Sequence, residues 1–180
     1  MARTPPAVSE RYLRWYANEY LKRYFTTRHH LAWLLKRRSQ LCIRANGGDL
    51  AEAVAWIDKI LDDLERMGAL NDALFVNAKV RSLLRKGNSE ALIRQKLGGL
   101  GVGGDSIKAI FSEIQEESGD PHFQAALNFA RKRRIGPFRL DKREEHRESD
   151  LAKLGRHGFR YDLAKRILAL EPDELDDPPF

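Results

Sequence analysis

Apolar residues recur every three to four positions from about Tyr12 to Leu170, which is the spacing of one face of an α-helix. No segment shows the sustained alternation of apolar and polar residues that is typical of a half-buried strand. The pattern therefore predicts an all-α protein. The clearest predicted helix begins at a capping box formed by Asp49 and Glu52 and ends at Gly68. The apolar stripe of this helix comprises Val54, Ile57, Ile60, Leu61, Leu64 and Met67.

Capping residues mark the starts of further helices. These signals include Asn71, Ser89 and Asp120, the last of which precedes a proline that loses no hydrogen bond at the first helical position. Asp141 and Glu144 are spaced as another capping box, which predicts a helix that begins there.

The helical pattern also repeats along the chain. The first repeated set is Leu97, Gly101, Val102, Asp105 and Ile110, which recurs at a constant offset as Leu154, Gly158, Phe159, Asp162 and Ile167. The second set is Thr27, Leu31 and Leu35, which recurs as Ser89, Ile93 and Leu97. Each set combines a helix, a turn or cap, and a further helix, with Asp105 and Asp162 as the expected caps. We therefore expect three tandem three-helix repeats in an elongated array, because one unit alone cannot bury both faces of its apolar stripes.

This pattern predicts the boundaries of the repeats. We expect a disordered N-terminus at residues 1–9, repeats at 10–69, 70–118 and 119–170, and an acidic disordered tail at 171–180. The first repeat is predicted to contain a long connection from about Lys36 to Asp49, and the third a long connection around Ile135 to Asp141.

Composition and charge narrow the class of protein. The chain has 180 residues, 42% of them hydrophobic, and a formal net charge of +6. The last ten residues hold five acids and no lysine or arginine, so the rest of the chain is more basic than the total suggests. A basic body with an acidic tail is typical of a protein that binds a polyanion. Without an apolar stretch of about 20 residues or a signal-peptide core, we expect a cytoplasmic protein without membrane association.

The sequence offers little for catalysis. Gly99–Gly104 matches the dinucleotide fingerprint in its letters, but that site needs a strand before the first glycine, and Glu90 to Leu97 has a helical pattern. Cys42 is the only cysteine, which excludes an internal disulfide. The five histidines lack metal-ligand spacing, and no serine lies in a nucleophile motif. We therefore expect no catalytic residues, no metal and no cofactor.

Clusters of basic residues are the strongest candidate site. They comprise Lys36, Arg37, Arg38, Arg81, Arg85, Lys86, Arg94, Lys96, Arg131, Lys132, Arg133 and Arg134. Each cluster lies near a predicted helix end, where the helix dipole also favours positive charge. Several clusters on one body nevertheless predict a binding stripe, for which nucleic-acid phosphates and an acidic protein groove are both suitable partners.

Aromatic residues lie among the first of these clusters. They are Tyr12, Trp15, Tyr16, Tyr20, Tyr24, Phe25 and Trp33. Because all of them have helical spacing, we expect most to pack in the core rather than to stack on bases.

Three stretches resemble the RecX family, the bacterial regulators of the RecA recombinase. The most specific is Met67 to Val76 followed by Val80-Arg81, and the others are Ile93 to Leu97 with Gly101-Val102 and Gly158 to Asp162 with Ile167. The resemblance covers about Arg11 to Leu170. The chain departs from the family at Thr27-Arg28-His29-His30, where a Ser-Arg-acid start is more usual, and in the greater length of the stretch from Lys36 to Asp49.

This resemblance implies a fold of three tandem three-helix repeats and a regulator without catalytic residues. It further implies binding within the groove of the RecA–DNA filament, with restraint of strand exchange, ATP turnover and stimulated repressor cleavage. We accordingly expect a monomer whose partners are the RecA filament and single- and double-stranded DNA. Two alternatives stay open: a helical transcription regulator that reads duplex DNA through Arg94 and Gln95, and a nucleotide-dependent enzyme that uses the glycine run.

Overall fold

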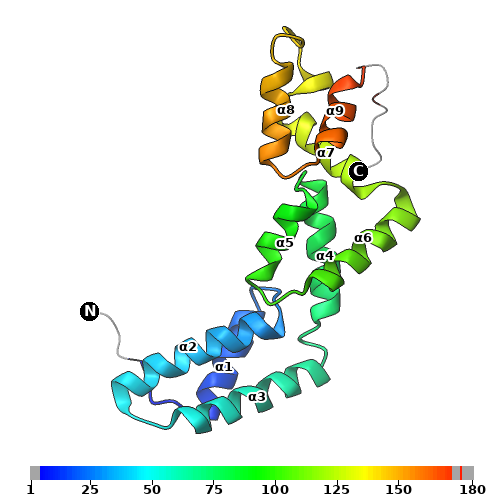
Figure 1. Cartoon of the computed structure of the whole chain (residues 1–180). Coiled ribbons are helices and arrows are strands. Elements are labelled where there is room, and N and C mark those ends of the chain that lie inside the picture. The colour runs from blue at the N-terminus through cyan, green and yellow to red at the C-terminus, as the bar shows by residue number, and fades with distance from the viewer. Residues whose placement is uncertain (1–4, 172–174, 176–180) are drawn as a thin grey trace. The chain divides into compact units, whose positions relative to one another are not determined.

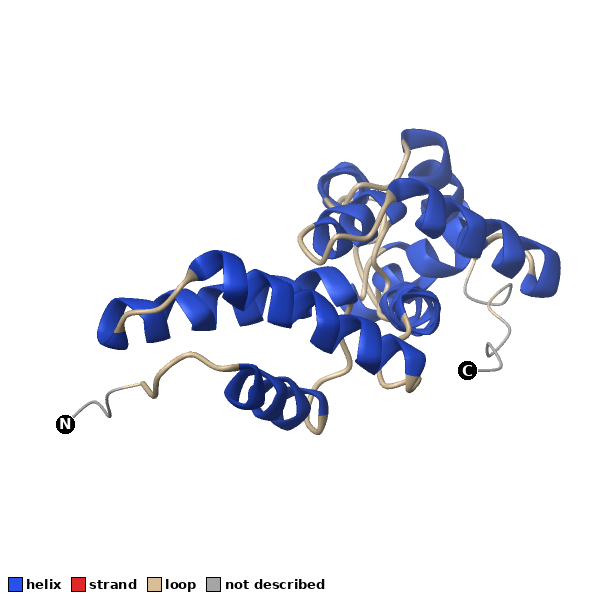
Figure 2. Cartoon of the chain, turned by 90° about the horizontal axis from the view of Figure 1, so that it is seen from below, coloured by secondary structure: helices blue, strands red, loops and turns tan. Residues whose placement is uncertain are grey.

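The computed structural model describes residues 5–171 and residue 175, and within them the secondary structure is entirely helical (Figure 1; Figure 2). The all-α class is confirmed. The helices are α1 (Glu10–Leu21), α2 (Arg28–Asn46), α3 (Leu50–Arg66), α4 (Asp72–Arg85), α5 (Glu90–Gly98), α6 (Gly104–Ser118), α7 (Pro121–Arg133), the short 3-10 turn η1 (Gly136–Phe138), α8 (Arg147–Arg156) and α9 (Tyr161–Ala169). None of these helices is both long and apolar enough to cross a bilayer.

The chain divides into two compact units. The first runs to Phe75 and includes the turn Gly99–Val102, whereas the second comprises Val76–Gly98 and the chain from Gly103 onward. The expected repeat boundaries at 69/70 and 118/119 fall between helices. The helix order is thus compatible with three tandem three-helix repeats.

In the first unit, α1, α2 and α3 share one core. Its fully buried side chains include Leu13, Leu31, Leu35, Ile57 and Ile60. The segment that precedes α1 also makes contacts in this unit, since Val8 packs against the core and the Asn46 side chain donates a hydrogen bond of 2.8 Å to the Pro5 carbonyl. Residues 1–4, and the acidic tail apart from Glu171 and residue 175, lie outside the described residues.

Helix α2 is longer than the sequence pattern predicted. It continues to Asn46, so the expected long connection from Lys36 to Asp49 is wrong, and only three residues join α2 to α3. Leu35, Ser39 and Cys42 explain the difference, because they extend the buried stripe at helical spacing. The Ser39 hydroxyl donates to the Leu35 carbonyl at 2.9 Å, which lets a polar residue occupy this buried position.

Helix α8 begins later than predicted. The expected capping box at Asp141 and Glu144 does not form, and α8 starts at Arg147 instead. Lys142 has a left-handed backbone with φ of 50°, which an α-helix excludes. The neighbouring Arg143 donates to the backbone carbonyls of Leu168 and Leu170, so tertiary contacts hold this segment in a turn.

The expected caps at Asp105 and Asp162 are also wrong. The N-cap residues are Gly103 for α6 and Arg160 for α9, and neither accepts a side-chain capping bond. The two aspartates lie in the first helical turn, where a carboxylate still complements the helix dipole. Asn71, Ser89 and Asp120, in contrast, cap their helices as predicted.

One tertiary hydrogen bond occurs twice, at equivalent positions of the repeat pattern. The Thr27 hydroxyl, at the start of α2, donates to the Leu100 carbonyl at 2.6 Å. The Ser89 hydroxyl, at the start of α5, donates to the His157 carbonyl, also at 2.6 Å. Each acceptor immediately precedes a glycine with positive φ, Gly101 or Gly158.

Candidate functional site

In the second unit, helix ends bring basic residues around one imidazole. His157 follows α8 and stacks on Phe129 of α7, with ring centroids 4.0 Å apart. Burial lowers the pKa of His157, and the charges of Lys96, Arg133 and Lys132 lower this pKa further, against a hydrogen bond to the backbone of Gly87 that raises it. Arg133 lies over the Phe129 ring on which His157 stacks, and Lys96 bonds to Asn88, the residue after Gly87. These contacts place cations of α5 and of the end of α7 near the imidazole. We call Lys96, Lys132 and Arg133 the basic cluster.

The basic cluster is open to an external anion. Lys96, Lys132 and Arg133 are exposed. The Lys96 ammonium touches the Asn88 side chain at 2.5 Å, and the Arg133 guanidinium lies 5.9 Å from the Phe129 ring, but no carboxylate among the described residues forms an ion pair with any of the three. Unneutralised charges of one sign, held by rigid helix ends, suit phosphates or an acidic protein surface.

Other members of the predicted stripe already have partners. Arg81 makes two hydrogen bonds of 2.8 and 3.1 Å to Glu117 and a third to Asn77, which ties α4 to α6. Arg94 pairs with Glu90 at 2.6 Å, and the Arg131 guanidinium lies over the Phe138 ring at 5.3 Å. These three side chains therefore support the fold more directly than they support binding.

The remaining members are distributed over both units. Arg85 and Lys86 are exposed at the end of α4, and Arg134 is the left-handed residue that ends α7. Lys36, Arg37 and Arg38 lie on α2 in the first unit, where Arg37 and Arg38 contact aromatic rings. The structure thus gathers three of the twelve predicted residues into one cluster and assigns the others to separate places.

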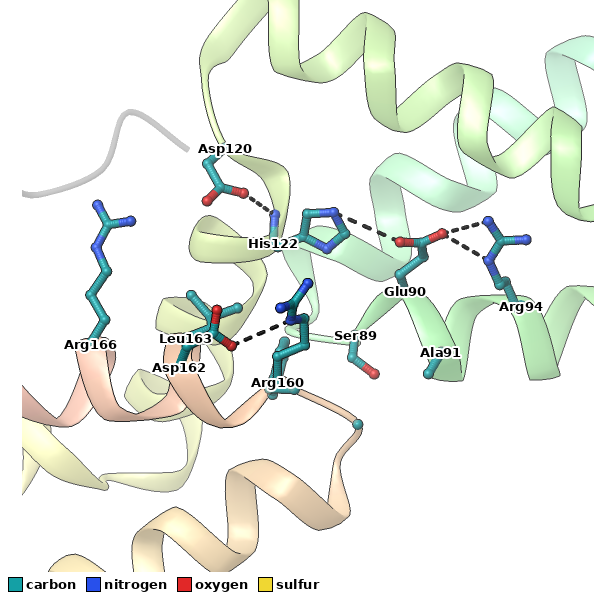
Figure 3. A pocket seen from close by; sticks show the side chains of 12 residues that line it. Ser89, Glu90, Ala91, Arg94, Asp120, His122, Arg160, Asp162, Leu163 and Arg166 are labelled. Atoms are coloured by element: carbon teal, nitrogen blue, oxygen red, sulfur yellow. Dashed lines mark hydrogen bonds and ion pairs between the residues drawn. The ribbon is translucent and has the colours of Figure 1, made fainter.

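A cleft of about 650 Å³ lies beside the starts of α5, α7 and α9 in the second unit (Figure 3). Its acids are engaged: Glu90 contacts Arg94 and lies 3.8 Å from His122, Asp120 caps α7, and Asp162 lies 3.4 Å from Arg160. Because positive and negative side chains alternate and neutralise one another, the cleft does not concentrate charge of one sign. The basic cluster is therefore the better candidate for polyanion binding.

The glycine run lacks the geometry of a nucleotide site. It follows helix α5 and not a strand. A Cβ on Gly101 would come within 2.4 Å of the His29 ring, so the His29 side chain fills the space beside this turn. No group of three or more potential metal ligands occurs in the part of the chain that the structure describes.

Two features of functional interest were missed by the sequence analysis. Asp150 is a buried acid with 1% of its surface exposed, yet it looks like any other charge in the sequence. Trp15, Tyr24, Phe25 and Trp33 are about half exposed, so the expectation of core packing is wrong for them. The basic residues that neighbour these aromatic residues in the sequence were the available signal for an exposed binding surface.

Comparison with known proteins gives two clear relatives. The regulatory protein RecX of Myxococcus xanthus is 38% identical over 170 residues, which are 93% of this chain and 90% of the relative. The regulatory protein RecX of Agrobacterium fabrum is 31% identical over 110 residues, which are 61% of this chain and 56% of the relative. No family model matches the chain, and no solved structure matches it.

Proposed function

The chain belongs to the RecX family of regulatory proteins, and from this premise we propose that it binds the filament formed by RecA on DNA and restrains its activity. The observation that carries the proposal is the 38% identity to a RecX protein across 93% of the chain. The protein acts by occupying the filament, without catalysis of its own. The proposal includes a cytoplasmic, monomeric protein that contacts both RecA and DNA.

The basic cluster supplies the electrostatic part of this binding. In the proposed complex, the exposed Lys96, Lys132 and Arg133 lie against phosphates or an acidic surface of the filament. Binding to phosphates releases condensed counterions, so the affinity falls as salt rises. Restraint of strand exchange, ATP turnover and stimulated repressor cleavage follows, because a filament with this protein bound across its subunits changes state less readily.

A transcription regulator is the second candidate, and the structure favours it less. Its base-reading residues would be Arg94 and Gln95 on α5, but Arg94 is held by Glu90 at 2.6 and 2.8 Å. A recognition helix presents free side chains to base edges. The filament proposal does not need Arg94 to be free.

A pull-down tests the proposed function. RecA is assembled on bead-bound single-stranded DNA and incubated with the purified protein, with DNA-only beads and immobilised RecA without DNA as controls. We expect the filament to retain more protein than either control. Equal retention on all three, or retention by DNA alone, would contradict the proposal.

Charge variants test the role of the basic cluster in the same assay. Replacing Lys96, Lys132 and Arg133 with alanine should weaken filament retention and flatten its salt dependence, by about 0.7–0.9 in the log–log slope for each phosphate that the variant no longer binds. The matched control replaces Lys79, Lys108 and Lys165, three exposed cations of the same unit that lie outside the cluster. An equal decrease in both triple variants would show that only net charge matters.

A further inference from the structure

Helix α1 carries aromatic side chains beside its buried stripe, and three of them, Tyr12, Tyr16 and Tyr20, pack partly buried against the core. Leu13 and Ala17 are its buried residues, whereas Trp15 is 56% exposed. Tyr24 after α1 and Trp33 on α2 are 55% and 49% exposed. Folded proteins seldom leave several large aromatic side chains exposed in one region unless the region binds a partner.

The rings of this region form two groups of contacts, one of Tyr12, Trp15 and Tyr16 and one of Tyr20, Tyr24, His30 and Trp33. Tyr12 and Trp15 stack with centroids 5.9 Å apart, and Tyr20 and Tyr24 lie 4.8 Å apart. His30 joins the two helices, since its ring is 6.3 Å from that of Tyr20 and stacks on Trp33 at 5.8 Å. We call this surface the aromatic face; it comprises Tyr12, Trp15, Tyr16, Tyr20, Tyr24, His30 and Trp33.

Part of the aromatic face forms a shallow groove of about 380 Å³. Arg23, Arg38 and Glu19 line it together with Trp15 and the four tyrosines of this region. The Arg38 guanidinium lies 5.5 Å from the ring centres of both Tyr12 and Tyr16, and its Nε donates to the Tyr12 hydroxyl at 2.5 Å. The Arg38 guanidinium thus packs on two of the rings that line the groove.

Charge identifies the class of ligand that this face suits. Residues 10–46 contain nine lysines and arginines but only two acids, Glu10 and Glu19, so they hold more positive charge than the whole chain. Both acids are paired, and the paired cations of this range are Arg14, Lys22 and Arg28, two of which contact acids of α3. The other six cations of this range form no ion pair with a described carboxylate: Arg11, Arg23, Lys36, Arg37, Arg38 and Arg44. The ligand is therefore an anion with flat apolar groups, which describes a nucleic acid better than an apolar protein surface.

We propose that the aromatic face binds single-stranded nucleic acid. Bases stack on Trp15, Tyr24 and Trp33, while the exposed Arg23 and Arg37 attract the phosphates. Arg38 holds the rings of Tyr12 and Tyr16 in place. Stacking of this kind tolerates any base sequence, and it requires unpaired bases because the faces of duplex bases are covered by their neighbours. The inference deepens the proposed function by naming a DNA-contacting surface, but it concerns free nucleic acid and does not need RecA.

Fluorescence anisotropy with a labelled oligothymidine, in the absence of RecA, tests the proposal. The variant Trp15→Ala/Trp33→Ala should bind the oligonucleotide at least about fivefold more weakly for each ring removed. The matched control is Tyr161→Ala, which removes a ring that is 64% exposed and has the Lys165 ammonium 5.3 Å from its centre, but belongs to the other unit. This control should bind as the wild type does, and circular dichroism should show equal helix content in all three proteins.

An oligonucleotide of equal length and charge that lacks bases separates stacking from attraction to phosphates. The wild type should bind this abasic strand about as weakly as the double variant binds oligothymidine. The double variant should bind the two strands with nearly equal affinity. Unchanged affinity of the double variant for oligothymidine, or equal affinity of the wild type for both strands, would overturn the proposal. A double variant that no longer binds RecA alone but keeps oligothymidine binding would assign the face to protein contact and would also overturn it.

These outcomes are independent of the filament pull-down. If the filament retains the protein but the aromatic variants bind oligothymidine normally, the proposed function stands and the aromatic face fails. If oligothymidine binding depends on the rings but the filament retains no protein, the aromatic face stands and the proposed function fails.

Discussion

Asp150 lies inside the second unit, where its carboxylate accepts two hydrogen bonds from Arg139, at 2.9 and 3.2 Å, one from Lys153 at 2.8 Å, and one from the Gly136 amide at 3.2 Å. Burial alone raises the pKa of Asp150, but these hydrogen bonds outweigh burial and hold the pKa below its ordinary value. The acid thereby fixes the turn after α7 against α8.

We predict that Asp150→Asn lowers the free energy of unfolding by about 3 kcal/mol, because it leaves the partly buried Arg139 without its counter-charge. Lys153→Ala is the matched control and should cost less than about 1 kcal/mol, since its ion pair is more exposed. Urea unfolding at pH 7 measures both changes. Similar costs for the two variants would show that the buried pair is not the source of stability.

The lowered pKa of Asp150 also predicts a pH dependence. The carboxylate stabilises the fold above the unfolded pKa of about 3.9, and this contribution is lost as the pH falls through that value toward the folded pKa. The wild-type thermal midpoint should therefore fall more steeply below about pH 4 than that of Asp150→Asn. Parallel curves would contradict the assignment.

His157 reports on the basic cluster directly. Its lowered pKa means that the neutral ring is favoured in the fold, so its contribution to stability is complete above about pH 6.5 and declines as the pH falls below that value. Phosphates bound at Lys96, Lys132 and Arg133 would offset the repulsion and raise the pKa of His157. We predict this upward shift in an NMR titration of the ring proton on addition of oligonucleotide; an unchanged titration in saturated protein would place the anion elsewhere.

At the scale of elements, the starts of α4, α5 and α7 followed from local sequence, whereas the starts of α6, α8 and α9 and the length of α2 did not. Asn71, Ser89 and Asp120 bond to amides of their own first turns, so the local sequence contains the whole signal. The extent of α2 follows from the helical spacing of Leu35, Ser39 and Cys42, in which a buried serine takes an apolar position. The late start of α8 depends on contacts with residues distant in sequence, such as those of Arg143 with Leu168 and Leu170. A periodicity argument does not contain such contacts.

The repeated hydroxyl bond gives physical content to the repeat pattern. Gly158 has a φ of 86°, and a Cβ there would lie 2.6 Å from the Ser89 hydroxyl and 3.2 Å from Ala91. Gly158 therefore allows the turn after α8 to lie close to the start of α5, so that the Ser89 hydroxyl can donate to the His157 carbonyl.

We predict that Gly158→Ala destabilises the protein by about 2 kcal/mol or more, through backbone strain and the loss of this approach. Gly155→Ala, three residues away inside α8 with no atom near the added methyl group, should be neutral or slightly stabilising. Thermal unfolding of the two variants provides the comparison. Equal midpoints would mean that the close approach at Gly158 contributes nothing to stability.

For the whole molecule, we propose one nucleic-acid contact surface in each of the two units. The second unit has the basic cluster around His157, and the first has the aromatic face on α1 and α2. The charge pattern of the sequence indicated both regions, but it did not indicate which side chains remain free. Arg81 and Arg94 form ion pairs with Glu117 and Glu90. The exposed rings have the same helical spacing as core residues. Only the packed structure separates these cases.

The rate of DNA-dependent ATP turnover by RecA filaments, titrated with this protein, tests the central claim most directly. The account predicts that turnover falls at well below one molecule per RecA subunit, because one bound protein affects several subunits. The triple variant of Lys96, Lys132 and Arg133 should require higher concentrations than the control variant of Lys79, Lys108 and Lys165. Turnover that stays unchanged up to equimolar wild-type protein, with binding shown separately, would contradict the claim that this protein restrains RecA.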